Sequence, residues 1–269
     1  MIDPFWVHFP SGWGLEGIRW YGLFYVVNFF LLEFFLHRYA QRKISPLDTA
    51  QSDRLLFIFA LGAVIGGRIG YCLFYNLDHF IQDPLIAFRV WAGGMASHGG
   101  FLGAILALFY FAWRYHCDVF WIADLFAATI PLCLGLGRLG NFINSELVGR
   151  VTEVPWGVIF PRVDPFVRHP SQLYEAFLEG FSLFIVLQIL LYRQYSTTKL
   201  WVWRSGTISG IFLIGYALMR IIGEMFREPD APLIFGMTRG QYYSLYLFLL
   251  GVVLLYLRRP KTSISPREP

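Results

Sequence analysis

Apolar residues fill long stretches of this chain, and the charged residues gather between them. Seven stretches approach the length of about 20 apolar residues that an α-helix needs to cross a bilayer core of roughly 30 Å. They are Ile18–Leu36, Leu55–Phe74, Met95–Trp113, Val119–Leu136, Leu173–Tyr192, Thr207–Phe226 and Tyr242–Leu257. The pattern predicts an all-α polytopic membrane protein with seven transmembrane helices. We expect residues 1–269 to form a single integral membrane domain.

Composition agrees with this prediction, because 56% of the residues are hydrophobic and only 15% are charged. Charged residues make up about a quarter of an ordinary soluble domain. No basic flank precedes a short apolar core at the N-terminus, so we expect no cleavable signal peptide. The cysteines, Cys72, Cys117 and Cys133, match neither a disulfide framework nor a zinc motif, and we interpret them as packing residues.

The basic residues predict the orientation of the chain. Twelve of the 22 Lys and Arg residues follow the first, third, fifth and seventh apolar stretches, which places them all on one side. They are Arg38, Arg42, Lys43, Arg54, Arg114, Arg193, Lys199, Arg204, Arg258, Arg259, Lys261 and Arg267. Basic loops stay on the cytoplasmic side of a membrane. We therefore predict an outside (periplasmic) N-terminus and a cytoplasmic C-terminus, and the net charge of +4 does not indicate a nucleic-acid partner.

Two further segments differ from the apolar stretches. The connection at about residues 144–172 contains four prolines and falls outside by this topology. A connection of this length is either a lid or binding element, or an irregular surface loop. The polar tail after about residue 258 is expected to be disordered and cytoplasmic.

Small residues recur four positions apart in three places, at Gly62–Gly66–Gly70, Gly99–Gly103 and Gly206–Gly210. This spacing lets helix backbones approach closely in lipid. We interpret it as helix packing and assign it no chemistry.

Ionisable and amide side chains at membrane depth give the best indication of function. Each charge at a helix centre costs about 2.5–3.5 kcal/mol on insertion scales. Eight such groups fall toward the outer side of the predicted helices: Arg68, His98, Arg138, Asn141, Glu175, Glu179, Arg220 and Glu224. Tyr21 begins the first helix on that side, whereas Asp124 lies near the inner end of the fourth. The shared depth predicts one site, although Arg220 and Glu224 could simply neutralise each other at i,i+4.

The densest motif is Gly135–Arg150, with three glycines around Arg138 and with Asn141 and Asn144 close behind. Glycines let a backbone approach a ligand, and asparagines add directional hydrogen bonds. We expect the arginines at this site to outnumber the nearby acids. An excess of guanidinium groups indicates an anionic ligand such as a phosphate. On these grounds alone the motif could equally line an anion pore.

Six blocks of the chain, in order, resemble the prolipoprotein diacylglyceryl transferase family. Gly137–Asn144, followed by Glu146 and Gly149, is similar to the family's signature. The other blocks are Trp20–Gly22, Gly66–Tyr71, Met95–Gly100, Arg168–Glu175 and Arg220–Arg227. Together they span about residues 20–230. Ser97 and Gly223 depart from the family's usual residues, and neither departure removes a proposed functional group.

The resemblance implies a bacterial enzyme of the cytoplasmic (inner) membrane that takes part in lipoprotein biogenesis. It would transfer the diacylglyceryl group of phosphatidylglycerol to the lipobox cysteine thiol of a prolipoprotein signal peptide, releasing glycerol 1-phosphate. The expected partners are therefore phosphatidylglycerol, that signal peptide and membrane lipids. We expect no cofactor, no metal and no nucleic acid.

The same resemblance suggests roles for individual residues. Arg138 and Arg220 would bind the phosphate and stabilise its developing charge, and Asn141 would orient it. His98 is either the base for the thiol, or a residue that orients lipid or caps backbone at the helix start. The remaining candidates are Tyr21 and Gly149 at the substrate and Glu146, Glu224, Arg68 and Tyr216 in support.

Several of these residues also allow a structural interpretation. Tyr21 could belong to an aromatic belt at the membrane surface. Glu146 would position Arg138 or the thiol, or act as a structural partner, and Arg68 is interpreted as structural rather than catalytic. No role is assigned to Arg168 or His169.

Two other classes of protein also use polar groups at membrane depth. A lipid or anion transporter also needs arginines at membrane depth, but its polar groups should continue into the cytoplasmic half, where this chain has little besides Asp124. An intramembrane hydrolase needs an activated nucleophile, and the sequence offers no convincing one.

Overall fold

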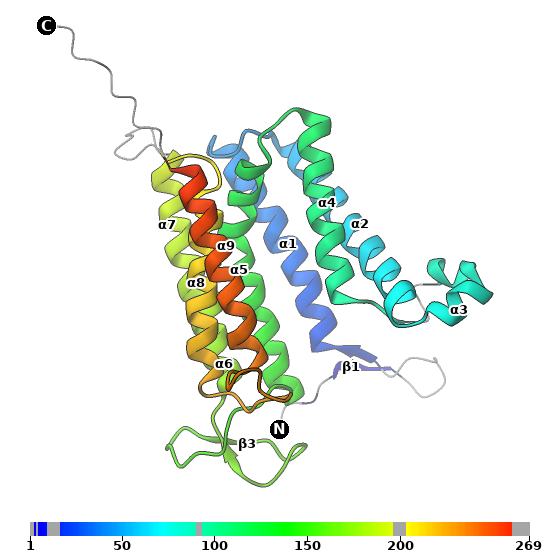
Figure 1. Ribbon diagram of the computed structural model, residues 1–269, viewed down its shortest axis with the longest axis vertical. Helices are drawn as coiled ribbons and strands as arrows, with labels where there is room; N and C mark the ends of the chain where they lie inside the picture. The colour runs from blue at the N-terminus through cyan, green and yellow to red at the C-terminus, as the bar shows by residue number, and fades with distance from the viewer. Residues whose placement is uncertain (1–2, 4, 10–16, 90–92, 196–202, 260–269) are drawn as a thin grey trace, which may run out of the picture. The chain divides into compact units, whose positions relative to one another are not determined.

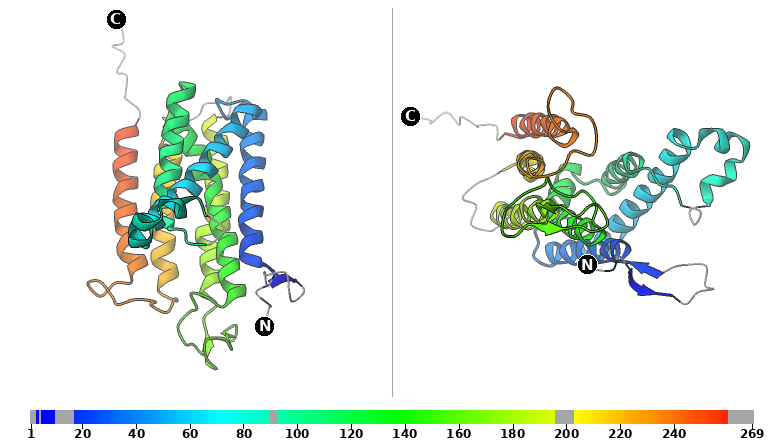
Figure 2. Two further views of the ribbon diagram at one scale, coloured as in Figure 1. Left: turned by 90° about the vertical axis from the view of Figure 1, so that its right-hand side faces the viewer. Right: turned by 90° about the horizontal axis from the view of Figure 1, so that it is seen from below.

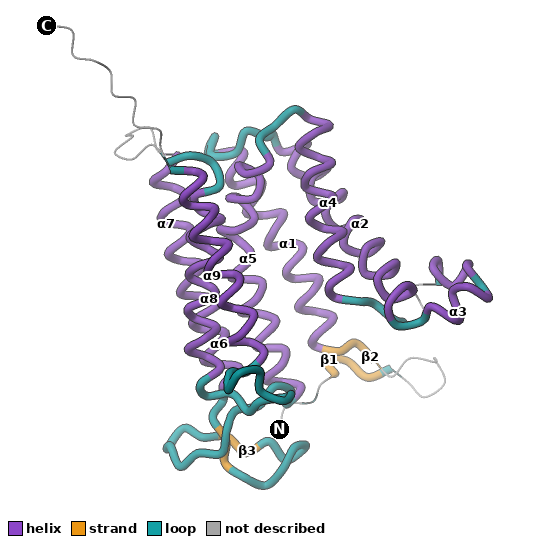
Figure 3. The backbone as a smooth tube through the Cα atoms, in the orientation of Figure 1, coloured by secondary structure: helices purple, strands orange, loops and turns teal. Residues whose placement is uncertain are grey.

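The computed structural model describes residues 3, 5–9, 17–89, 93–195 and 203–259, and most of them are helical (Figure 1). The helices are α1 (Trp20–Gln41), α2 (Thr49–Phe74), α3 (Leu77–Gln82), the 3₁₀ helix η1 (Pro84–Phe88), α4 (Ser97–Tyr115), α5 (Val119–Asn144), α6 (Ser171–Glu175), the π-helical η3 (Ala176–Ser182), α7 (Leu183–Tyr195), α8 (Thr207–Glu224) and α9 (Arg239–Arg258). Two short antiparallel pairs, β1 (Phe5–His8) with β2 (Gly17–Arg19) and β3 (Val158–Ile159) with β4 (Val167–Arg168), interrupt this pattern (Figure 3).

Six helical segments in the described part of the chain are long and apolar enough to cross a membrane. They are Gly22–Gln41, Thr49–Phe74, Val119–Asn144, Ser171–Tyr195, Thr207–Glu224 and Arg239–Arg258. The prediction of a mostly helical, multi-pass membrane protein is thereby confirmed. The predicted stretch Met95–Trp113 forms α4, and its crossing of a membrane stays a prediction. The predicted disordered tail lies, from residue 260 onward, outside the described residues.

Helix ends differ from the apolar stretches where polar side chains cap them. Asp48 accepts a hydrogen bond from the backbone N–H of Gln51, whose side chain bonds back to Asp48 N, so α2 begins before Leu55. Thr238 and Gln241 cap α9 in the same way. Helix α5 continues past Leu136 to Asn144, since glycines are tolerated in membrane helices.

The chain divides into two compact units, residues 1–32 with 124–269 and residues 33–123. In the second unit α2 and α4 run side by side (Figure 1). Glycines form their contact: a methyl group at Gly66 would lie 2.3 Å from the carbonyl oxygen of Gly99, and one at Gly103 would lie 2.1 Å from that of Gly62. The packing predicted from the glycine spacing is therefore confirmed for this pair of helices.

In the first unit α8 lies beside α9 in both views of Figure 2. Gly210 again allows the approach, because a methyl group there would lie 2.7 Å from Leu255 and 3.3 Å from the Gly251 carbonyl. Helix α5 meets η3 in the same manner, where an added methyl at Gly180 would lie 2.5 Å from the Cα of Gly135. Gly135 thus serves helix packing.

Asp124, the acid that the predicted depth left unexplained, fixes the start of α8. Its fully buried carboxylate accepts hydrogen bonds from the backbone N–H groups of Gly206 (2.8 Å) and Ser209 (2.8 Å) and from the Ser209 hydroxyl (2.7 Å). The first N–H groups of a helix have no partner inside the helix. Asp124 supplies one from α5 and so stabilises the contact between the two helices.

The segment between α5 and α6 is held to the residues that follow α8. Backbone hydrogen bonds run from Arg150 N to Phe226 O (2.9 Å) and from Glu228 N to Val148 O (3.1 Å). Within the segment the Arg168 guanidinium binds Asp164, and these hydrogen bonds lower the pKa of the Asp164 carboxyl below its ordinary value. The predicted long connection is therefore an ordered structure with fixed anchor points.

Glycine packing between α2 and α4 gives a direct test. We expect Gly103→Ala to lower the midpoint of thermal unfolding in detergent, because its methyl group must displace the α2 backbone, at a cost of about 1–3 kcal/mol. Gly100→Ala is the matched control on the same helix, since the nearest atom to its methyl, Ala63 O, would be 3.4 Å away. Equal midpoints for the two variants would contradict a glycine-mediated contact.

Candidate functional site

Three arginines and three glutamates form a buried network of ion pairs in the first unit. Arg138 comes from α5, Glu175 and Glu179 from α6 and η3, and Arg220 and Glu224 from α8, with Arg227 just beyond. Arg138 Nε lies 3.1 Å from Glu175 Oε2, and Arg138 Nη2 lies 3.3 Å from Glu179 Oε2. Helices far apart in the sequence thus meet through charged groups.

Arg220 is the second cation of this network and contacts all three glutamates. Its Nη1 lies 3.2 Å from Glu175 Oε2 and 3.2 Å from Glu179 Oε1, while its Nη2 donates to Glu224 Oε1. Glu224 therefore does pair with Arg220 at i,i+4, as the simple neutralisation hypothesis predicted. That pair is only one edge of a larger network.

Glu175 is the acid that all three arginines share. Its side chain is fully buried, and Arg227 Nη1 approaches its Oε1 at 3.9 Å. Arg227 also lies 3.6 Å from Glu224 Oε1 and 2.7 Å from Asp230 Oδ2. Breaking one member of a buried ion network leaves the others uncompensated, so each group depends on the rest.

The prediction that arginines outnumber the nearby acids is wrong. Each of the three arginines is paired with at least two carboxylates, and Asp230 adds a fourth acid. Glu175, Glu179 and Glu224 were already among the predicted groups, and Arg227 and Asp230, which lie beyond α8, complete the network. Glu179 lies in the π-helical turn of η3. Segments of π-helix occur frequently at functional sites.

The guanidinium groups nevertheless keep donors that the carboxylates do not use. Among the described residues, no hydrogen bond or ion pair joins Arg138 Nη1 or Arg220 Nε to an acceptor. The side chains of Arg138 and Arg220 are 15% and 11% exposed, whereas those of Glu175 and Glu179 are fully buried. The acids therefore orient the two cations from the protein side and leave a donor edge for another anion.

Glycines in two helices make room for the glutamates. A methyl group at Gly223 would lie 3.0 Å from Glu175 Cγ, and one at Gly240 would lie 2.2 Å from Glu224 Oε1. The departure from the family pattern at Gly223 therefore coincides with a close approach of the α8 backbone to Glu175.

The motif at the end of α5 forms a second set of contacts. Asn141 and Asn144 both donate to the Glu146 carboxylate, at 3.0 and 3.4 Å, and Gln172 donates to the Glu146 carbonyl at 2.7 Å. Among the described residues Glu146 makes no ion pair with Arg138, so its partners are these amides. Ser145 and Leu147 have positive φ, which turns the chain sharply at this point.

Gly149 is required by its neighbour in the loop. A methyl group there would lie 2.2 Å from the carbonyl oxygen of His169. This close backbone approach accounts for the glycine, and contact with a substrate stays a prediction. A small cavity of about 220 Å³ opens nearby, lined by Phe142, Ile143, Ser145, Val158, Ile159, Phe160 and Pro161.

The second unit holds two of the predicted residues, Arg68 and His98. The buried Arg68 guanidinium donates to the backbone carbonyls of Ile86, Ala87, Arg89, Gly93 and Gly94. It therefore fixes these carbonyls to α2, and its interpretation as structural rather than catalytic stays a prediction. His98 is exposed in the first turn of α4 and makes no hydrogen bond to another described residue.

The remaining candidates predicted from the sequence are two tyrosines. Tyr216 precedes Arg220 by one turn of α8, with its ring 5.9 Å from that of Phe212. Tyr21 lies in the first turn of α1, and its side chain is outside the described part of the structure. Arg227 is the functional candidate that sequence reasoning missed, although its spacing of three from Glu224 was a readable signal.

The fold and the site define a multi-pass helical membrane protein with a buried cluster of arginines and glutamates. Comparison of sequences identifies the family of this membrane protein. The model of the prolipoprotein diacylglyceryl transferase family matches residues 12–257, and the chain belongs to this family.

Several relatives share this similarity over nearly the whole chain. A phosphatidylglycerol–prolipoprotein diacylglyceryl transferase of Photobacterium profundum is 45% identical over 97% of this chain and 96% of the relative. Proteins of the same name from Vibrio cholerae and Shewanella are 46% and 45% identical, over 90% and 94% of this chain and 88% and 95% of each relative.

The ion network predicts a large difference between two glutamates. We expect Glu175→Gln to lower the free energy of unfolding by on the order of 3 kcal/mol, because it leaves buried guanidiniums without their shared carboxylate. The control is Glu228→Gln, whose side chain is 51% exposed and 3.4 Å from Arg168, and which should cost at most about 1 kcal/mol. Thermal unfolding in detergent measures both, and similar midpoints would mean that the network does not stabilise the fold.

Proposed function

We propose that this chain transfers the diacylglyceryl group of phosphatidylglycerol to the lipobox cysteine thiol of a prolipoprotein signal peptide and releases glycerol 1-phosphate. The observation that carries the proposal is the pair Arg138 and Arg220, held by buried glutamates with donor atoms left over. The names of the relatives supply the substrates, phosphatidylglycerol and prolipoprotein.

The enzyme works in the bacterial inner membrane with seven spans, α4 included. Its N-terminus is periplasmic and its C-terminus cytoplasmic, in accord with the basic residues that follow alternate helices. Arg138 then lies toward the outer leaflet, where the thiol of an exported preprotein arrives. The anchored segment between α5 and α6 covers this side as a binding element.

Arg138 and Arg220 bind the phosphate of the lipid headgroup through the guanidinium edges that the glutamates leave open. The bond that breaks joins the glycerol carbon to a phosphate oxygen, so negative charge grows on that oxygen. Cations fixed in advance stabilise this charge without having to reorganise. Asn141, held by Glu146 at 3.0 Å, orients the headgroup beside them, with Tyr21 and Gly149 completing the contact.

The sulfur of the lipobox cysteine forms the new bond to the glycerol carbon. A thiol attacks well only after losing its proton, and its ordinary pKa is near 8.5. His98 accepts this proton, because a neutral imidazole is an effective base near neutral pH. Glu146, Glu224 and Tyr216 support the phosphate site, and Arg68 keeps the segment before His98 in place.

The proposed reaction has a direct test. Purified protein, phosphatidylglycerol and a lipobox peptide should give a peptide heavier by one diacylglyceryl unit in the mass spectrum. A peptide with serine in place of the cysteine is the control and should stay unmodified. An unchanged cysteine peptide would refute the activity, and a modified serine peptide would refute the thiol as acceptor.

Shape, as well as charge, matters at the two arginines. Arg138→Lys and Arg220→Lys keep the charge but lose the planar fork that binds two phosphate oxygens. We expect each to reduce the transfer rate at least tenfold, about 1.4 kcal/mol in activation free energy. Arg150→Lys is the control, because the Arg150 Nε binds only the Arg227 carbonyl among the described residues. Near-normal rates for both site variants would exclude the phosphate clamp.

The role of His98 predicts a change in pH dependence. His98→Gln should lose most activity near pH 7 and regain it toward pH 9, since hydroxide then ionises the acceptor thiol without a protein base. The comparison is kcat/KM of wild type and variant across this range. A rate ratio that does not change with pH would remove His98 as the base.

A further inference from the structure

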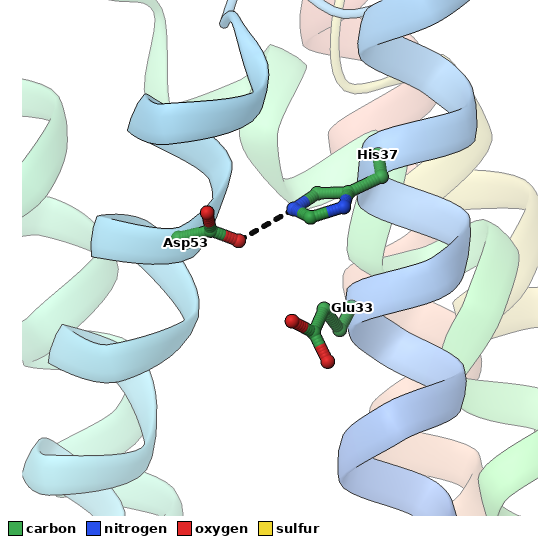
Figure 4. A group of neighbouring side chains, drawn as sticks. All are labelled: Glu33, His37 and Asp53. Atoms are coloured by element: carbon green, nitrogen blue, oxygen red, sulfur yellow. Dashed lines mark hydrogen bonds and ion pairs between the residues drawn. The ribbon is translucent and has the colours of Figure 1, made fainter.

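A second cluster of potential metal ligands, two carboxylates and an imidazole, shares no residue with the proposed site. It joins Glu33 and His37 of α1 to Asp53 of α2, all in the second unit (Figure 4). One donor atom from each of the three lies within 4.8 Å of the other two, and His37 Nε2 is 2.5 Å from Asp53 Oδ1. We propose that this cluster binds a divalent late transition metal ion, of which Zn²⁺ is the representative.

The donors are held on regular helices. Glu33 and His37 are four residues apart, so they lie on one face of α1. Asp53 lies near the start of α2, which Asp48 caps. The turn between the two helices is fixed by backbone hydrogen bonds, such as Ile44 N to Tyr39 O at 2.9 Å. Sites built on helices hold their ligands more precisely than sites built on loops.

The three groups are suitable ligands in number and kind. Zn²⁺ binds imidazole nitrogen and carboxylate oxygen at about 2.0–2.2 Å, which puts two tetrahedral ligands roughly 3.3 Å apart. His37 Nε2 and Asp53 Oδ1 are 2.5 Å apart in a direct hydrogen bond, so they must move apart by about 0.8 Å to bind one ion. The Glu33 carboxylate faces the same gap between α1 and α2 (Figure 4). Two carboxylates balance the charge of a divalent ion. The imidazole favours Zn²⁺ over Mg²⁺ or Ca²⁺, which prefer oxygen ligands alone.

Glu33 gives the strongest reason to expect a cation. Its half-buried carboxylate follows an apolar run of α1 and makes no hydrogen bond or ion pair with another described residue. A charge in a membrane-spanning helix is costly without a partner. The hydrogen bond between His37 and Asp53 accounts for those two residues but not for Glu33. A metal ion gives all three a common partner.

The neighbouring arginines do not fill this role. Arg38 and Arg54 adjoin His37 and Asp53 in the sequence, and both are exposed. Within the part of the chain that the structure describes, neither forms an ion pair with Glu33 or Asp53. Their charges lower the affinity for a cation, so the binding must come from the ligands themselves.

The test is zinc binding by the full-length protein in detergent, after removal of the purification tag and treatment with a chelator. Calorimetric titration with ZnCl₂ should show one site, and zinc should raise the midpoint of thermal unfolding. His37→Gln and Glu33→Gln should each weaken zinc binding at least tenfold. Both variants should keep the transfer activity, which shows that they are folded.

His116→Gln is the matched control, because His116 is an exposed histidine of the same unit, next to Cys117 and Asp118. It should leave the affinity unchanged, and millimolar Mg²⁺ should not displace the zinc. Three outcomes would each overturn the proposal. The wild type could fail to bind zinc, His37→Gln could bind it as tightly as the wild type, or His116→Gln alone could lose binding. None of these outcomes bears on the diacylglyceryl transfer.

Discussion

The structure depends on carboxylates that hold arginines inside a membrane protein. Glu175 and Glu179 are fully buried, and each would be costly without a cation; Arg138 and Arg220 would be equally costly without an acid. Together they require α5, the turn from α6 into η3, and α8 to meet at one place. The same contacts fix two guanidinium groups before any ligand arrives, which is the condition for electrostatic stabilisation of a charged transition state.

Close backbone contact makes these polar interactions possible. Lipid gives no hydrophobic drive for helices to associate, so packing between small residues must supply part of the attraction. Gly66 and Gly103 do this between α2 and α4, and Gly135 and Gly180 do it between α5 and η3. The second of these contacts lies on the helices that carry Arg138 and Glu179, which links helix packing directly to the proposed site.

Much of this arrangement could be predicted from the sequence, because membrane helices and buried charges leave strong signals. The apolar stretches located the helices, and the shared depth of Arg138 and Arg220 indicated their meeting. Pairing could not be predicted as well, since the carboxylate that each guanidinium meets depends on how α5, η3 and α8 pack against one another. The partners of Glu146 were also uncertain, because they depend on the sharp turn at Ser145 and Leu147. The cluster of Glu33, His37 and Asp53 could not be predicted from a sequence motif, because Asp53 is sixteen residues from His37.

Gly240 has a consequence for how α9 can vary. Its Cα hydrogen is directed at Glu224, and the carboxylate fills the volume that any larger side chain would need. A substitution in the first turn of α9 would therefore act as an electrostatic change, by pushing a negative charge away from Arg220. The identity of one uncharged residue at the start of α9 thus affects the electrostatic field at the Arg220 guanidinium through the position of Glu224.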